Sequence, residues 1–183
     1  MQKTIYKKVS TSSISISELM LPSHTNFSGK IHGGYILSLL DQVAFASASK
    51  FSGYYCVTAS VDRVDFINPI EVGELVTLKA CVNYVGNSSM IVGIRVEAEN
   101  IQTGRIKHCN SSYFTMVAKD REGNNAAVPG LELCDEDDIR RFINCLKQIE
   151  LKKERDLHEE KFNYSKAEAF SILKKYPVVI SAS

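Results

Sequence analysis

Apolar residues fill most positions between Ile31 and Lys50, whereas the polar residues of this stretch recur on one narrow stripe. At a helical period of about 3.6 residues, the apolar side chains cover most of the circumference. This distribution predicts a helix that is largely buried and carries a single polar line. The polar line consists of Ser38, Asp41, Gln42 and Ser49.

Beyond a turn at Ser52 and Gly53, apolar residues alternate with polar ones, which is typical of strands with one buried face. Two such runs, residues 76–84 and 90–98, are joined through Gly86-Asn87-Ser88 and predict a long β-hairpin. Strand character continues over residues 105–118 and is also expected over residues 10–21. A strand over residues 56–66 changes its apolar face near Asp62 and Arg63, which indicates a bulge. The expected fold is α+β, with a long, curved antiparallel sheet wrapped around the central helix.

The composition changes after Pro129, and the tail is expected to be helical. Acidic residues 135–138 precede an apolar stripe and basic residues follow it, as the helix dipole favours. The apolar stripe comprises Ile139, Phe142, Ile143, Leu146 and Ile149. A second helix is expected to begin at Ser165, which has capping-box spacing to Glu168, and to end at Pro177. We therefore divide the chain into a sheet domain, residues 10–125, and a C-terminal helical extension, residues 131–177, whose apolar stripe we expect to pack between subunits.

The charge composition argues against a broad polyanion-binding surface. The chain has 22 Lys and Arg against 21 Asp and Glu, a net charge of +1, so neither nucleic acid nor a membrane is expected as a partner. The N-terminus lacks an apolar signal segment, no stretch approaches the length of a membrane span, and the five cysteines form no C-x-x-C pair. A cytoplasmic protein with reduced thiols is the expectation.

Gly34 and Asp41 lie about two helical turns apart, so both face nearly the same side of the predicted helix. A Gly-Gly pair at a helix start lets a ligand approach the backbone, and the free N–H groups there favour an oxygen that gains negative charge. Asp41 would then activate water against that carbonyl. The alternative is that Asp41 faces solvent and that the glycines only form a tight loop, and the pattern leaves both open. No Lys or Arg lies three or four residues from Asp41, so a helix-internal ion pair does not explain this acid.

Three strings carry a resemblance to a known family: LPSHTNFSGKIHGGYILSLLDQVA, then VTASVDRVDF with NPIEVGE, and then AENIQTGR. Over residues 10–118 the chain resembles the hotdog-fold acyl-CoA thioesterases, particularly the bacterial short-chain and mammalian brain-type acyl-CoA hydrolases. The resemblance implies a hotdog fold and hydrolysis of acyl-CoA to free fatty acid and CoA. It implies no metal or redox cofactor, because CoA is part of the substrate and product.

The resemblance also implies roles for individual residues. Asp41 corresponds to the family's helix acid, a general base or nucleophile. Asn26 corresponds to the loop asparagine that orients water or substrate, and Gly34 to the backbone donor to the thioester carbonyl. In the family these groups come from two subunits, so a homodimer is the expected active unit, commonly gathered into a homohexamer as a trimer of dimers.

The same resemblance implies that CoA is held near the predicted hairpin turn. The expected substrate-binding residues are Gly33, Asn87, Ser88, Ser89 and Arg63. Further candidate partners for the CoA phosphates are Arg95, Arg105 and Lys107, although a surface ion pair is the ordinary role of such cations.

Other functions of the fold are less well matched. A non-catalytic acyl-CoA sensor needs affinity but no water-activating acid, so the presence of both Asn26 and Asp41 argues against it. A dehydratase would use a histidine, but His32 lacks the H-F-P context of that branch and is interpreted as a loop residue. Cys109 beside His108 is not a nucleophile pair, because neighbours in a strand point to opposite faces, and no metal-ligand spacing is present.

Overall fold

The computed structural model describes residues 5–160 and 165–179, apart from the side chains of Arg63 and of residues 158–160, 166 and 167. The described chain forms two compact units, the first ending at Cys145 and the second beginning at Leu146. In chain order, the elements are β1 (Tyr6–Lys8), η1 (Val9–Ser12), β2 (Ile14–Leu19), η2 (Pro22–His24), α1 (Gly33–Ser52), β3 (Tyr55–Phe66), β4 (Glu74–Val85), β5 (Ser89–Asn100), β6 (Arg105–Lys119), β7 (Gly130–Glu132), α2 (Glu136–Glu160) and α3 (Lys166–Leu173).

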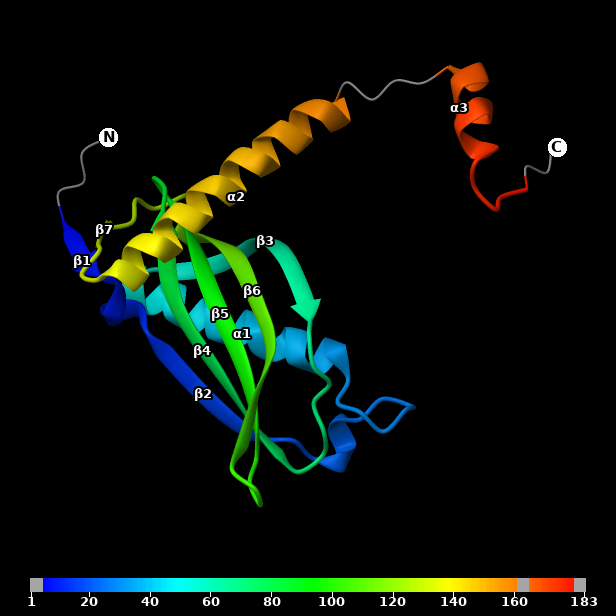
Figure 1. Ribbon diagram of the computed structural model, residues 1–183. Coiled ribbons are helices and arrows are strands. Elements are labelled where there is room, and N and C mark those ends of the chain that lie inside the picture. The colour runs from blue at the N-terminus through cyan, green and yellow to red at the C-terminus, as the bar shows by residue number, and fades with distance from the viewer. Residues whose placement is uncertain (1–4, 161–164, 180–183) are drawn as a thin grey trace. The chain divides into compact units, whose positions relative to one another are not determined.

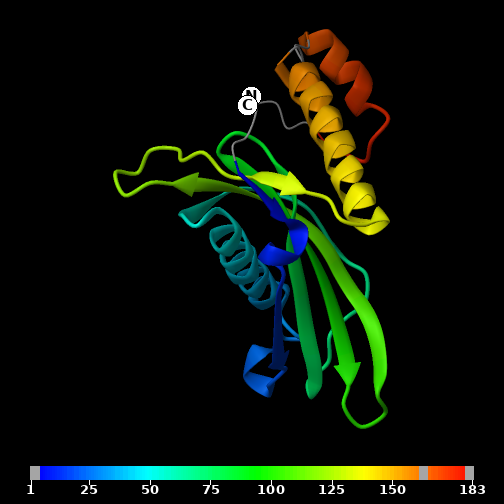
Figure 2. The ribbon, with the colours of Figure 1, turned by 90° about the vertical axis from the view of Figure 1, so that its left-hand side faces the viewer.

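A five-stranded antiparallel sheet with the order β2-β4-β5-β6-β3 forms the first unit together with α1. The helix lies along one face of the sheet, and the strands curve around it (Figures 1 and 2). The predicted hairpin is present as β4 and β5, in which Glu74 pairs with Asn100 and Val85 with Met90. The expected α+β hotdog arrangement is therefore confirmed.

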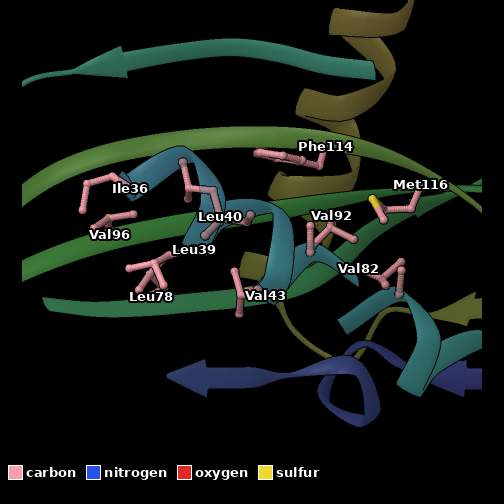
Figure 3. Packing of buried hydrophobic residues seen from close by; sticks show 14 of the residues in the cluster. Ile36, Leu39, Leu40, Val43, Leu78, Val82, Val92, Val96, Phe114 and Met116 are labelled. Carbon is pink, nitrogen blue, oxygen red and sulfur yellow. The ribbon is translucent and has the colours of Figure 1, made fainter. Parts of the chain in front are cut away.

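The core lies between α1 and the inner face of the sheet, as the two periodicities predict. On α1, residues such as Ile36, Leu40 and Val43 are fully or almost fully buried, and they pack on alternate residues of β4, β5 and β6 (Figure 3). The sheet residues labelled there are Leu78, Val82, Val92, Val96, Phe114 and Met116.

The helix begins two residues later than Ile31, the start that the pattern predicted. Ile31 forms an isolated bridge with Thr25 and donates its N–H to the carbonyl of Ile70, so its backbone belongs to the preceding loop. His32 then caps the helix. At the other end Gly53 has φ +79°, a left-handed conformation in which glycine ends the helix without a Cβ penalty.

Strand β3 contains the expected irregularity and one more. Its register against β6 shifts between Val61 and Val64, where the bulge was predicted, and also between Thr58 and Ser60. The short parallel pair β1 and β7 was not predicted, because three-residue strands carry too little alternation to be recognised.

The two units divide within α2. Its first residues pack on the outer face of the sheet of the same chain: the Phe142 ring lies 5.5 Å from that of Tyr84, and Cys145 is fully buried. Two members of the predicted apolar stripe, Ile139 and Ile143, instead remain 51% and 43% exposed.

In the second unit, α3 has the predicted capping box. Ser165 Oγ accepts from the Glu168 N–H, and the Glu168 carboxylate accepts from the Ser165 N–H. The helix ends at Leu173, before the predicted end at Pro177, and residues 174–177 form a turn.

Candidate active site

Asp41 lies on the exposed side of α1, an orientation that the sequence pattern left open. Its helix neighbours one turn before and after, Leu37 and Phe45, are both 38% exposed. No ion pair to Asp41 occurs within the described residues. The carboxylate is therefore flanked along the helix by apolar surface that a single chain leaves open to solvent.

Thr58 of β3 holds this carboxylate. Its Oγ1 donates a hydrogen bond of 2.5 Å to Asp41 Oδ1 and lies 3.5 Å from the sulfur of Met116. Thr58 was not predicted as a site residue, because a threonine in a strand is ordinary and only tertiary pairing of α1 with β3 brings it to the acid. The one feature of the sequence that could have indicated it is the spacing: Thr58 follows Cys56 by two residues, so both point to the same face of β3, and Cys56 is buried.

Asn26 shapes its own loop. Its Oδ1 accepts hydrogen bonds from the Ser28 N–H at 2.9 Å, the Ser28 hydroxyl at 2.7 Å and the Lys30 N–H at 3.2 Å. This is the turn-forming role that an asparagine commonly plays. The turn uses the oxygen, so the amide NH₂ is the part of Asn26 that is suited to donate to a ligand.

The first turn of α1 is less open than the Gly-Gly pair predicted. The Gly34 N–H donates to His32 Nδ1 at 2.9 Å, and a Cβ added at Gly34 would lie 3.0 Å from the imidazole. A Cβ added at Gly33 would lie 3.4 Å from the ring of Phe66. In this chain, the glycines therefore make room for two neighbouring rings, and the interpretation of His32 as structural agrees with its capping contact.

The same turn is braced by the strand and loop before it. The Tyr35 hydroxyl donates to Glu18 Oε1, and this hydrogen bond raises the pKa of Tyr35 above its usual value. The His24 ring stacks on that of Tyr35 at 4.0 Å. These contacts connect β2, the loop of Asn26 and the start of α1.

Within one chain, Gly34 and Asp41 are too far apart to act on the same carbonyl group. Seven residues of helix separate them by ~10 Å along the axis, whereas groups acting on one carbonyl must each approach to about 3 Å. The two residues therefore share a helix face, as expected, but within a single subunit the helical rise keeps them too far apart to act on one carbonyl.

The hairpin turn of Asn87, Ser88 and Ser89 is level with Asp41 along the strands. Thr58 pairs with Met116, which pairs with Met90, so two strand spacings, about 10 Å, separate Thr58 from the end of the turn. The turn is fixed by backbone hydrogen bonds from the Ala118 N–H to the Ser88 carbonyl and from the Val128 N–H to the Asn87 carbonyl, both 2.9 Å.

A cavity of about 350 Å³ borders this turn, with Tyr6, Val85, Gly86, Asn87, Gly130, Leu131 and Phe142 as its described lining. This lining contains no lysine or arginine. Arg95 and Lys107 are instead bound in ion pairs, to Glu97 at 2.7 Å and to Glu74 at 2.8 Å. The candidate phosphate partners thus do not gather at the turn, while the side chain of Arg63 lies outside the described residues.

A second, larger cavity, about 600 Å³, lies on the opposite face of the sheet from α1. Its lining includes Lys79, Cys81, Asn83, Arg95, Tyr113 and Arg141, but neither Asn26, Gly34 nor Asp41. Two of its lining residues, Lys79 and Arg95, donate hydrogen bonds to Glu97 and lower the pKa of that carboxyl. This cavity is therefore separate from the candidate site at Asp41.

The rejected alternatives have structural explanations. Cys109 is fully buried, and burial raises the pKa of its thiol. His108 points to the other face, where its Nε2 lies 2.9 Å from both the Asn110 carbonyl and Ser111 Oγ. Within the described residues, no group of three or more His, Cys, Asp or Glu side chains is arranged to hold a metal ion. Nor is any described helix sufficiently long and apolar to span a bilayer.

Comparison with known sequences identifies related proteins. A family model described as the thioesterase superfamily matches residues 28–104. Protein VdlD of Helicobacter pylori (strain ATCC 700392 / 26695) is 44% identical over 137 residues, which span 75% of this chain and 78% of that protein. YkhA of Bacillus subtilis, described as an uncharacterized acyl-CoA thioester hydrolase, is 33% identical over 77% of this chain and 82% of its own length.

Solved structures with the same fold include two acyl-CoA-hydrolysing enzymes. The acyl-CoA hydrolase of Staphylococcus aureus, in complex with butyryl coenzyme A, coenzyme A and coenzyme A disulfide, superposes with a TM-score of 0.79 at 30% identity, over 85% of this chain and 95% of that one. A hexameric acyl-CoA thioesterase without ligand gives 0.81 at 34% identity, over 83% and 97%. Three further structures of the Staphylococcus aureus enzyme carry single alanine substitutions, of an asparagine, an aspartate and a threonine.

Proposed function

The chain belongs to the thioesterase superfamily, and from this premise we propose that it hydrolyses acyl-CoA to free fatty acid and CoA at a site built on Asp41 and Thr58. The hydrogen bond between these two side chains carries the proposal. It fixes the orientation of an exposed carboxylate beside apolar surface, which suits an acid that meets a polar thioester attached to an acyl chain.

Asp41 serves as general base or as nucleophile. As a base, it accepts a proton from water while the water oxygen bonds to the thioester carbon, and the tetrahedral intermediate then expels CoA as a thiolate, which takes up a proton. As a nucleophile, its carboxylate bonds to that carbon and CoA leaves. Water then hydrolyses the resulting anhydride and restores Asp41. In both routes Thr58 orients the reacting carboxylate.

The spacing of Asn26, Asp41 and Thr58 supports these roles. The three residues that are replaced by alanine in the Staphylococcus aureus enzyme are an asparagine, an aspartate and a threonine, separated by the same numbers of residues as these three here. We assign to Asn26 the orientation of water or substrate through its amide NH₂. We assign to the Gly34 N–H the stabilisation of negative charge on the thioester oxygen.

The active unit in this proposal is a homodimer. Because Gly34 and Asp41 of one chain are ~10 Å apart along the helix, a second copy must supply the loop that faces Asp41. Strand β3 is at the edge of the sheet and carries exposed Tyr55, Val61 and Phe66, a surface that a two-fold partner would cover. The hexamers among the structural neighbours support further assembly of such dimers.

CoA is proposed to lie toward the hairpin turn of Asn87, Ser88 and Ser89, which is level with Asp41 in the sheet. Gly33 would then border the thioester end of the substrate. Arg63 remains a candidate for a phosphate contact.

The test is the loss of thioester absorbance over a panel of acyl-CoA chain lengths, which avoids interference from the exposed Cys134 thiol. We expect hydrolysis by the unaltered protein. For Asp41→Asn, we expect kcat lower by about 10² or more, since general-base catalysis typically contributes about 10²–10⁴, with acyl-CoA still bound. Binding without hydrolysis in the unaltered protein would establish a sensor instead.

A further inference from the structure

His32 occupies the N–H that the proposed mechanism requires. Its Nδ1 accepts from Gly34 at 2.9 Å, and a backbone N–H can only donate, so Nδ1 is unprotonated in this contact. The ring lies directly over Gly34, where an added Cβ would approach it to 3.0 Å. A thioester carbonyl that takes the same hydrogen bond must therefore replace the imidazole.

The contact is built so that the ring can leave without disturbing the loop. The His32 backbone is held separately: its N–H donates to the His24 carbonyl at 2.8 Å, and its carbonyl accepts from Tyr35 at 3.0 Å. The side chain is exposed. Rotation about the side-chain torsions therefore moves the imidazole into solvent while Asn26 and the helix start keep their backbone positions.

We propose that His32 is a positioning residue that holds the Gly34 N–H in the free enzyme and gives it up only to an acyl thioester. The inference rests on the proposed function of Gly34. CoA has no carbonyl at its sulfur and does not compete with the imidazole, whereas acyl-CoA does. His32 therefore sets how strongly the site favours acyl-CoA over CoA, and its imidazole accepts the Gly34 hydrogen bond while no substrate is bound.

Two substitutions separate this role from simple helix capping. His32→Ala removes the competing acceptor, whereas His32→Asn keeps a side-chain oxygen that reaches the same N–H and is a favoured N-cap. The net value of one hydrogen bond corresponds to a two- to tenfold change, roughly, in an equilibrium constant. In the unaltered enzyme the imidazole is displaced equally in the substrate complex and in the transition state. Its removal should therefore change KM but not kcat.

The experiment measures kcat and KM for butyryl-CoA, the inhibition constant of CoA, and Tm in the three proteins. For His32→Ala, we expect KM lower by about two- to tenfold, with kcat and CoA inhibition unchanged and Tm reduced. His32→Asn should restore the original KM and Tm.

Equal KM values in His32→Ala and the unaltered enzyme, or equal changes for butyryl-CoA and CoA, would overturn the inference. A large fall in kcat would also overturn it, because His32 would then take part in the chemistry. An unaltered protein that hydrolyses no acyl-CoA overturns the proposed function, a result that the first measurement reveals by itself.

Discussion

Thr58 and Asp41 come from neighbouring elements, β3 and α1, and are joined by a 2.5 Å hydrogen bond from hydroxyl to carboxylate. Short hydrogen bonds to an ionised oxygen are about twice as strong as neutral ones. The pair therefore fixes the orientation of the carboxylate, with Oδ1 directed at Thr58.

Removal of the Thr58 hydroxyl should impair the acid without unfolding the protein. Thr58→Val keeps the side-chain shape, and hydrogen bonds to charged groups contribute about 1.5–3 kcal/mol, so we expect kcat to fall roughly 10- to 100-fold. Thr58→Ser, which retains the donor, should keep most of the activity. Because Thr58 is exposed, Tm should change little in either variant. Equal kcat values for the valine and serine variants would show that the hydroxyl has no role.

A shared site predicts that two inactive variants restore each other. Asn26→Asp keeps the oxygen that closes the turn but removes the amide donors, and Asp41→Asn removes the acid. After subunit exchange, about half of the dimers contain one chain of each kind, and such a dimer has one intact site if Asn26 and Asp41 act across the two-fold axis.

The measurement is acyl-CoA hydrolysis after mixing, with each variant carried alone through the same exchange step as the control. Subunit exchange is monitored by native mass spectrometry on differently tagged chains. Exchange without recovered activity would place Asn26 and Asp41 of the same chain in one site.

The exposed part of the α2 stripe predicts a contact between copies. Phe142 and Cys145 are already used against the sheet of their own chain, whereas Ile139 and Ile143 remain exposed beside them. We expect Ile139→Ser with Ile143→Ser to lower the oligomer mass in light scattering, while hydrolysis per dimer persists in part. Lys147→Ser, at another exposed position of the helix, is the matched control. An unchanged mass would mean that this side of α2 supports no assembly.

The two units predict different effects of truncation. Ending the chain after Pro129 removes β7 and all of α2, so it uncovers Tyr84 and neighbouring residues of the outer sheet face. Ending it after Cys145 keeps the packed part of α2. We expect a marked loss of Tm for the shorter chain and a small loss for the longer one, measured by circular dichroism. Equal Tm values would show that the start of α2 adds nothing to the stability of the sheet.

Alkaline stability should depend on Cys145. Burial raises the pKa of its thiol to about 12 in the folded chain, with smaller effects from Cys81 and Asp62, whereas an unfolded cysteine titrates near 8.5, roughly. The folded state therefore keeps a proton that the unfolded state loses. The resulting stability is complete below the unfolded pKa and is lost as pH rises toward the folded one.

We expect the urea midpoint of the unaltered protein to fall from pH 9 toward pH 12, within the range set by that pKa, and to fall less steeply in Cys145→Ala. Cys134→Ser, which changes an exposed thiol, should leave the slope as it is. A slope that is the same with and without Cys145 would contradict the assigned environment of this residue.

The sequence determined the elements whose periodicity is long and regular. The central helix and the hairpin of β4 and β5 follow from spacing, because side-chain direction repeats with the backbone geometry in helices and strands. The two tail helices follow from an apolar stripe with charged ends and from a capping box. The polar stripe placed Asp41 on one line of the helix but left its exposure open. Resemblance over a motif of asparagine, glycines and aspartate then supplied the family.

Tertiary structure decided what each site residue touches. Thr58 meets Asp41 only because β3 returns beside α1, and the Gly34 N–H is held by His32 because the imidazole folds back over a residue without a Cβ. No periodic pattern in the sequence predicts either contact, since each depends on the distance between particular side chains. The separation of Gly34 from Asp41 has the same physical origin: residues on one helix face share a direction, but the helical rise keeps them apart, so a second chain is needed to complete the site that we propose.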